Sequence, residues 1–173
     1  PSKPYSREPF ATDVSEGKND PIYNAHSYHT KVPHKAIMRY ILHYTEPGDI
    51  VFDGFCGTGM TGIAAQMCST RAGVESLGLK VQKDGIVHDE TGERTGNIGI
   101  RHAVLCDLSP IASFVAARYN DFRPSVFSSA AIKKLIDILK MEFGNYYTTQ
   151  APNSNSTGEA QFYVWSEVFA CPH

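Results

Sequence analysis

The sequence lacks any long apolar run. No stretch approaches the ~20 apolar residues that a membrane-spanning helix needs, and the first ten residues lack the apolar core of a signal peptide. It also lacks an excess of charge of one sign, because 16 Lys and Arg residues stand against 18 Asp and Glu residues, for a net charge of -2. A polybasic protein that binds nucleic acid or membranes mainly through charge is therefore excluded. We expect a soluble, cytoplasmic protein with no membrane partner.

Cysteine is scarce, and its spacing carries no metal or disulfide signature. The four cysteines form no Cys-x-x-Cys pair and lack the close spacing of a small secreted disulfide framework. His26, His29 and His34 lie within nine residues, but no acid or cysteine accompanies them at ligand spacing. We therefore predict a reducing compartment and no metal site.

What is present suits one main domain with flanking segments. With 42% hydrophobic residues, the chain can bury a core of domain size. Residues 1–32 hold four of the ten prolines and no sustained periodicity, which indicates an extended arm with a tight turn near 19–21. Residues 33–147 form the predicted main domain. Residues 148–173 are predicted to be a polar linker and the truncated start of a further region.

Helices and strands alternate along the main domain. Apolar spacing predicts helices over 33–44, 60–68, 110–119 and 124–143, and β-rich runs predict strands at 50–52, 102–106 and 161–169, the first of them buried. The glycine-rich segment 69–99 exceeds the usual connection between a helix and a strand, so we expect an insertion with a β-hairpin around 83–85. This order predicts an α/β fold with a mainly parallel sheet and flanking helices, only partly present.

The most informative segment is the glycine-rich turn between the strand at 50–52 and the helix at 60–68. Gly57, Gly59 and Gly62 satisfy G-x-G-x-x-G, the fingerprint of dinucleotide-binding oxidoreductases. However, the strand ends in the carboxylate Asp53, and bulky residues separate it from the first of these glycines. A pyrophosphate favours glycine directly after the strand and no anion beside it, whereas an acidic strand end suits a cation. The dinucleotide interpretation stays open as an alternative.

The same segment resembles the S-adenosylmethionine site of the amino-methylating DNA methyltransferases. Their first motif has the form Asp-Pro-Phe-Cys/Ala-Gly-Ser/Thr-Gly-Thr, and the residues matching it here are Asp53, Gly54, Phe55, Cys56, Gly57, Thr58 and Gly59. The chain departs from the motif at Gly54 and Met60, and neither change removes a carboxylate or a turn glycine. The resemblance implies a partial Rossmann-like methyltransferase fold in which these seven residues bind the cofactor.

Flanking segments extend the resemblance over residues 26–120. Asp107 ends the next predicted strand in the family's Asp-x-Ser/Asn-Pro context, which implies that Asp107 binds the ribose hydroxyls and that Leu108 also belongs to the cofactor-binding residues. The alternative for Asp107 is a helix-capping neighbour of Ser109. Upstream, Thr30 and Lys31 fall in a segment similar to the family's His-x-x-x-Lys-Pro, which folds over the methionine end of the cofactor.

The motif that performs amino methylation in this family is missing. The chain has no Pro-Pro dipeptide, so it lacks the Asp/Asn/Ser-Pro-Pro-Tyr/Phe motif that holds a flipped base. We therefore assign no catalytic residue and expect a fragment of a DNA adenine-N6 or cytosine-N4 methyltransferase, inactive alone, whose downstream region binds DNA. Cys171-Pro172-His173 resembles the approach to a Cys-Pro-x-Cys knuckle, but we predict no zinc in this chain. A methyltransferase acting on RNA is a further alternative.

Overall fold

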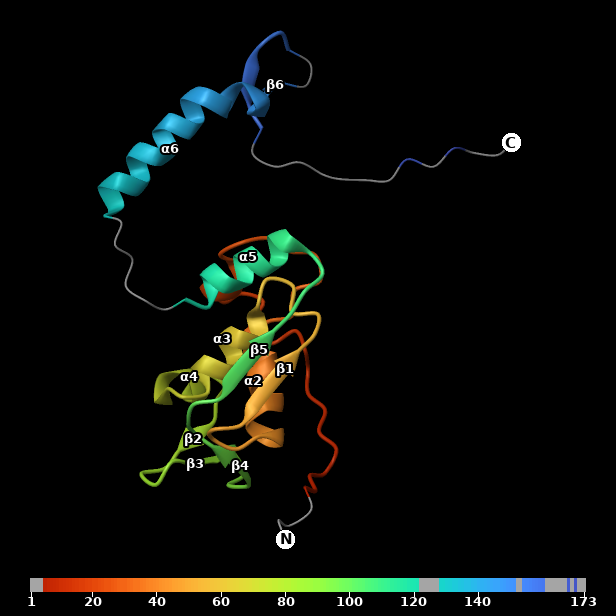
Figure 1. The fold of residues 1–173 in the computed structure, drawn as a ribbon, viewed down its shortest axis with the longest axis vertical. Coiled ribbons are helices and arrows are strands. Elements are labelled where there is room, and N and C mark those ends of the chain that lie inside the picture. Colours follow the sequence, from red (N-terminus) through yellow and green to blue (C-terminus); the bar gives the residue numbers. More distant parts are fainter. Residues whose placement is uncertain (1–4, 122–127, 152–153, 161–167, 169, 171–173) are drawn as a thin grey trace. The chain divides into compact units, whose positions relative to one another are not determined.

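The computed structural model describes residues 5–121, 128–151, 154–160, 168 and 170. The chain forms two compact units, residues 1–122 and 123–173 (Figure 1). The sequence prediction instead ended the main domain at residue 147, because the apolar spacing of 124–143 looked like that of any domain helix.

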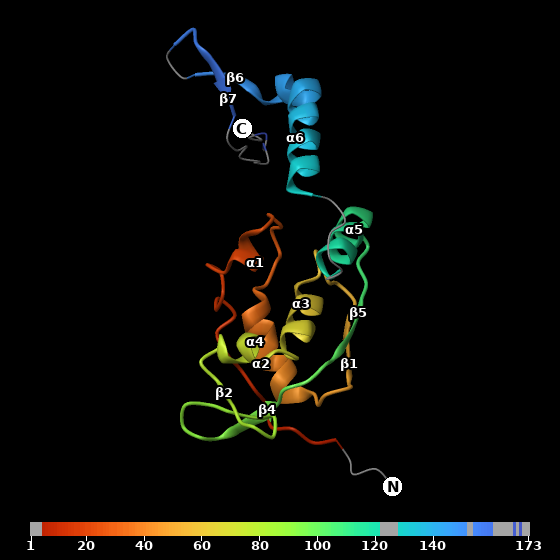
Figure 2. The ribbon, with the colours of Figure 1, turned by 90° about the vertical axis from the view of Figure 1, so that its left-hand side faces the viewer.

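The first unit is built on a small parallel sheet. Strands β1 (Ile50–Asp53) and β5 (His102–Leu105) pair in parallel, with Val51 opposite Ala103 and Asp53 opposite Leu105. Helices α2 (His34–Tyr44) and α3 (Met60–Met67) lie together on one side of this pair, as Figure 2 shows. Helix α5 (Pro110–Tyr119) follows β5, with Ser109 as its N-cap.

Within the described part of the first unit, the opposite face of the β1–β5 sheet is exposed. Ile50 and Phe52 are 68% and 69% exposed, and Val104 on β5 is also exposed. The prediction of a buried strand at 50–52 is therefore wrong. In a strand, successive side chains point to opposite faces, and helices of the first unit cover only the face of Val51 and Ala103.

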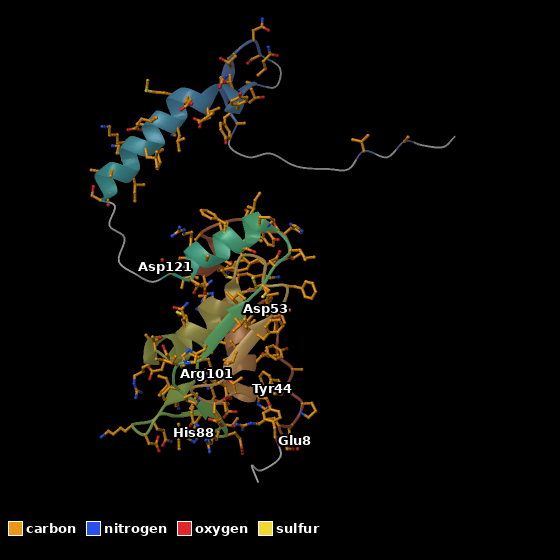
Figure 3. All side chains as sticks on the ribbon, viewed as in Figure 1. Glu8, Tyr44, Asp53, His88, Arg101 and Asp121 are labelled. Atoms are coloured by element: carbon orange, nitrogen blue, oxygen red, sulfur yellow. The ribbon has the colours of Figure 1, made fainter. Side chains whose placement is uncertain are left out.

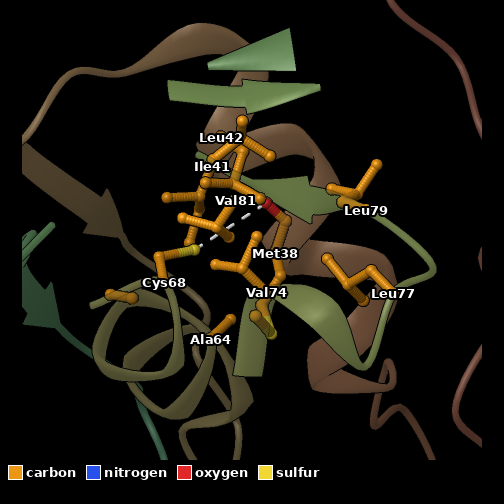
Figure 4. Packing of buried hydrophobic residues seen from close by; sticks show 11 residues of the cluster. Met38, Ile41, Leu42, Ala64, Cys68, Val74, Leu77, Leu79 and Val81 are labelled. Atoms are coloured by element: carbon orange, nitrogen blue, oxygen red, sulfur yellow. Dashed lines mark hydrogen bonds between the residues drawn. The ribbon is translucent and has the colours of Figure 1, made fainter. Parts of the chain in front are cut away.

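The insertion predicted at 69–99 is folded and supplies much of the core. It contains α4 (Arg71–Glu75) and an antiparallel sheet of β2 (Lys80–Val81), β3 (Ile86–His88) and β4 (Arg94–Asn97), which confirms the hairpin expected around 83–85. Five of the eleven core residues come from this segment (Figure 4). The others come from α2, from α3 and from Cys68, the C-cap of α3. The burial of Cys68 raises the pKa of its thiol to about 12, so it stays protonated.

The N-terminal arm lies along α2. It contains a turn at residues 14–19 and the short helix α1 (Pro21–Asn24), capped by the Asp20 carboxylate. The predicted tight turn near 19–21 is thus the start of this helix. The arm is fixed to α2 by a hydrogen bond from the Phe10 amide to the Tyr44 hydroxyl (2.8 Å) and by an ion pair between Arg39 and Glu16.

The second unit consists of α6 (Ser129–Phe143), the 3₁₀ turn η1 (Gly144–Tyr147), and the antiparallel strands β6 (Thr148–Gln150) and β7 (Thr157–Glu159). The linker predicted at 148–160 therefore contains a β-hairpin, which its polar composition did not indicate. The strand predicted at 161–169 lies outside the described residues except for Val168, which is in no strand.

The architecture is a mixed α/β arrangement with a small parallel sheet and helices. Of the three sheets in the described residues, β1–β5 is parallel, as the α/β prediction expected for the strands at 50–52 and 102–106, and the other two are antiparallel. Both antiparallel sheets join strands close in sequence, a pairing that short turns allow. Within the described residues no helix is both long and apolar enough to cross a membrane.

Candidate functional site

The candidate site lies where β1 and β5 end. Because the strands are parallel and Asp53 pairs with Leu105, their carboxyl ends meet at one edge of the sheet (Figure 3 labels Asp53). The glycine turn, residues 54–59, leaves this edge and enters α3, and Asp107 follows β5 at the same edge. A hydrogen bond from the Cys56 amide to the Cys106 carbonyl (2.9 Å) joins the two strand ends.

Asp53 is held by the turn and by the first turn of α3. One carboxylate oxygen accepts a hydrogen bond from the Phe55 amide (3.1 Å), and the other accepts one from the Thr61 hydroxyl (2.5 Å). Each oxygen of an ionised carboxylate has room for a further donor. The side chain is thus fixed in place and can still bind a cationic or hydrogen-bonding group.

Asp107 connects the glycine turn with the start of α5. It accepts hydrogen bonds from the amides of Gly57 (2.8 Å) and Ser109 (2.9 Å), one to each oxygen. Ser109 in turn caps α5 by accepting from the Ala112 amide (3.3 Å). The helix-capping neighbour considered from the sequence is therefore present, but the same carboxylate also holds the glycine turn. Its role toward a ribose stays a prediction.

Two glycines of the turn adopt a left-handed backbone. Gly57 has φ of 52° and Gly59 has φ of 86°, a conformation that side chains with a Cβ rarely adopt. A Cβ on Gly57 would lie 2.9 Å from the Tyr28 ring, and one on Gly59 would lie 2.5 Å from the Asn120 amide nitrogen. The turn therefore requires glycine at both positions, for its backbone angle and for its close neighbours.

A cavity of about 250 Å³ opens between the arm, α2 and this turn. Seven predicted site residues line it: Thr30, Lys31, Asp53, Phe55, Cys56, Gly57 and Thr58. Gly54, Gly59, Asp107 and Leu108 do not line it. The sequence interpretation missed five lining residues: Tyr28, Val32, Ile37, Met60 and Thr61. Thr61 could have been found from the sequence, because it is the second residue of the helix that follows the glycine turn.

Lys31 lines the cavity, but its ammonium group binds the arm. It donates hydrogen bonds to the carbonyls of Tyr23 and His26 and lies 4.5 Å from the centre of the Tyr23 ring. Burial lowers the pKa of Lys31 from its usual value. The side chain therefore closes the arm segment 23–31 into a loop at the edge of the cavity. A direct contact with a cofactor stays a prediction.

The other predicted residues divide between the cavity wall and its surroundings. Burial, then the carboxylates of Asp53 and Asp107, raises the pKa of the Cys56 thiol, so it stays protonated and is no nucleophile. Phe55 and Leu108 are largely exposed. In the described part of the chain, no three His, Cys, Asp or Glu side chains are grouped to hold a metal ion. The Cys171 segment lies outside it except for Ala170.

The family model for DNA methylases matches residues 6–101, which is more than half of the chain. The chain belongs to the N6/N4 DNA methylase family. No curated protein and no solved structure matches it. In this DNA methylase, the matched range contains the arm from residue 6 onward, the glycine turn and every lining residue of the cavity, from Tyr28 to Thr61. Asp107 and Leu108 lie beyond that range, so their assignment depends on the geometry described above.

Proposed function

We propose that this DNA methylase chain binds S-adenosylmethionine, with the methionine end in the cavity and the ribose at Asp107. One observation carries the proposal. The carboxylates of Asp53 and Asp107, from the ends of adjacent parallel strands, are both hydrogen-bonded to the glycine turn that lines the cavity. Ligands in open α/β sheets bind at the carboxyl ends of the strands, which is where this turn lies.

The charges around the cavity suit the two ends of the methionine group. S-adenosylmethionine carries a sulfonium and an α-ammonium group, both of which a nearby carboxylate such as Asp53 stabilises. Lys31 lines the cavity, and its ammonium group, which donates two hydrogen bonds to the arm, has a third N–H that can donate to the ligand's carboxylate. Asp107 accepts a hydrogen bond from the amide of Gly57, a lining residue, and each of its oxygens can accept one ribose hydroxyl besides its backbone amide.

The contacts of Gly57 count against a dinucleotide. A pyrophosphate would need the backbone amides of the glycine turn. The Gly57 amide already donates to Asp107, and this carboxylate would repel a phosphate placed there. A dinucleotide-binding oxidoreductase site is the weaker alternative, and it predicts that the chain binds NAD instead of S-adenosylhomocysteine.

The reaction that we propose for the complete enzyme is methyl transfer to an exocyclic amine of DNA, adenine N6 or cytosine N4. The residues described here position the cofactor, which supplies the methyl group. The chain holds no Pro-Pro-aromatic motif, so residues outside it bind the base in this proposal. An RNA acceptor is the alternative, and it would use the same cofactor site.

Calorimetric titration tests the cofactor. The chain should bind S-adenosylhomocysteine and not NAD. Asp53→Asn should weaken binding about ten- to hundredfold, because a hydrogen bond to a charged group is worth ~1.5–3 kcal/mol. Asp49→Asn is the matched control. Asp49 directly precedes the first residue of β1, at the end of the strand away from the site, and its carboxylate accepts a hydrogen bond from the Glu46 amide (2.8 Å). Binding of NAD alone, or equal affinity of parent and Asp53→Asn, would contradict the proposal.

Tritium transfer from labelled cofactor tests the division of labour. With mixed-sequence DNA or RNA, residues 1–173 should give background counts, since the net charge of -2 offers little attraction for phosphates. Transfer to either nucleic acid by this chain alone would place the base-binding residues within it.

A further inference from the structure

His26, a residue of the arm, contacts the glycine turn directly. Its Nε2 atom lies 2.7 Å from the hydroxyl of Thr58, within hydrogen-bond distance. Thr58 is only 4% exposed and stands between the two left-handed glycines. His26 does not line the cavity, whereas Thr58 does. His26 therefore contacts a residue of the cavity wall without itself being part of that wall.

The imidazole of His26 is fixed on its other sides. Its ring stands edge-on to the Tyr119 ring of α5, with centroids 4.8 Å apart and an interplanar angle of 84°. The Tyr119 hydroxyl donates to the Ile22 carbonyl, and the Lys31 ammonium donates to the carbonyl of His26 itself. The backbone of His26 is thus tied to Lys31, and its ring packs on Tyr119 while it contacts Thr58.

The protonation state of His26 suits this contact. Burial, and then the positive charge of Lys31, lowers the pKa of the imidazole, so the ring is neutral near pH 7. A neutral imidazole has one N–H donor and one acceptor nitrogen, and the Thr58 hydroxyl can pair with either tautomer at Nε2.

A second set of hydrogen bonds holds the next residue of the turn, Gly59. Asn120, the C-cap of α5, donates from its amide to the Gly59 carbonyl (3.0 Å) and to the Ala116 carbonyl (2.9 Å). Hydrogen-bond contacts therefore hold the turn at Thr58, through His26 of the arm, and at Gly59, through Asn120 at the end of α5. A binding loop that is held in its bound shape before the ligand arrives loses less free energy on binding.

We infer that His26 is a positioning residue of the cofactor site: it holds Thr58, and through it the glycine turn, in the conformation that binds the ligand. This inference rests on the proposed function, because it assigns a role within that same site. It also explains why the arm carries a histidine at this position, which a purely apolar packing contact with Tyr119 would not require.

The test separates the hydrogen bond from the packing of the ring. His26→Phe keeps an aromatic ring against Tyr119 but cannot bond Thr58, and His26→Gln keeps a donor and an acceptor near the Nε2 position. If His26→Phe leaves the turn in its binding shape for only a tenth of the time, affinity for S-adenosylhomocysteine falls about tenfold. His26→Gln should restore it to within about twofold. His29→Phe, on the same arm and stacked on Tyr28, is the matched control and should bind like the parent.

A double-mutant cycle and amide hydrogen exchange decide the outcome. Thr58→Val removes the same hydrogen bond, so His26→Phe should weaken Thr58→Val no further, and additive losses would overturn the inference. In the ligand-free protein, the Gly59 amide, bonded to the Cys56 carbonyl (2.8 Å), should exchange faster in His26→Phe, with the Cys68 amide as reference. Unchanged Gly59 exchange would also overturn it. If the parent binds no S-adenosylhomocysteine, the proposed function fails, and the exchange comparison still decides the role of His26.

Discussion

Asp107 accepts two backbone amides, so its replacement changes both the turn and the ligand site. In Asp107→Asn the new amide group points a donor toward either the Gly57 or the Ser109 N–H, and the charge is lost. We expect affinity for S-adenosylhomocysteine to fall about tenfold or more, because charged hydrogen bonds are worth ~1.5–3 kcal/mol. Calorimetry with S-adenosylhomocysteine and with a ligand lacking the ribose hydroxyls checks this. The ligand without hydroxyls should lose less affinity on the variant, and equal losses would limit Asp107 to holding the turn.

His34 makes the stability of the first unit depend on pH. Its side chain is completely buried, neither ring nitrogen has a hydrogen-bond partner among the described residues, and a carboxylate oxygen of Asp20 lies 3.9 Å from Nε2. Burial lowers the pKa of this imidazole in the folded state below 6.5. The unfolded chain therefore binds a proton first as the pH falls, and the free energy of unfolding decreases below pH 6.5.

His34→Leu should remove this part of the acid sensitivity. The contribution of one such group changes by at most about 1.4 kcal/mol per pH unit. Urea unfolding of parent and variant between pH 5 and 7.5 measures the difference, which should grow in favour of the variant toward low pH. Parallel curves would mean that the imidazole is protonated in the folded state.

Helix α3 shows how packing reverses an ordinary helix propensity. Alanine normally stabilises a helix relative to glycine by about 1 kcal/mol. At Gly62, however, a Cβ would lie 2.2 Å from the Asn120 amide oxygen and 2.9 Å from a Leu105 methyl. Gly62→Ala should therefore lower the melting temperature and weaken the hydrogen bond from the Asn120 amide to the Gly59 carbonyl. Gly144→Ala, where nothing lies within 4 Å, should leave it unchanged.

The insertion at 69–99 is predicted to be indispensable for folding. Leu77, which follows α4, is 4% exposed and belongs to the core cluster with Met38 and Leu42. Leu77→Ala should cost about 2–5 kcal/mol, the usual range for a buried leucine. Chemical denaturation measures this value, and a cost below 0.5 kcal/mol would show that the insertion is only an appendage.

The elements that the sequence predicted well are those whose pattern is local. The spacing of Met38, Ile41 and Leu42 predicted α2 to within one residue. The difference of one residue arises because Pro33 is the N-cap of this helix and not its first residue. The contribution of the insertion was missed because β2 and β3 have only two and three residues, too few for a periodicity to show. The site divides in the same way: Asp53 and the glycines follow from the motif, whereas Tyr28 and Asn120 meet the turn only through long-range folding.

At the scale of the whole molecule, the proposed cofactor site belongs to the first unit alone. Every residue that lines the cavity, and the whole core cluster, falls within residues 1–122. A chain of residues 1–122 should therefore bind S-adenosylhomocysteine within about twofold of the affinity of residues 1–173. Calorimetry of the two chains checks this. A large loss would show that the second unit also takes part in binding.

The parallel register of β1 and β5 determines where the chain can gain or lose residues without displacing the site. The segment between these strands is anchored just before β5, where the Gly48 amide bonds the Ile100 carbonyl (2.7 Å) and the His102 amide bonds the Asp49 carbonyl (2.9 Å). Codons gained or lost at the tip near Asp84 leave this anchor untouched. One codon gained between 100 and 105 would slide Asp107 by about 3.3 Å and turn it to the other face of the sheet. Length polymorphism should therefore accumulate at the tip near Asp84 and be purged from residues 100–105.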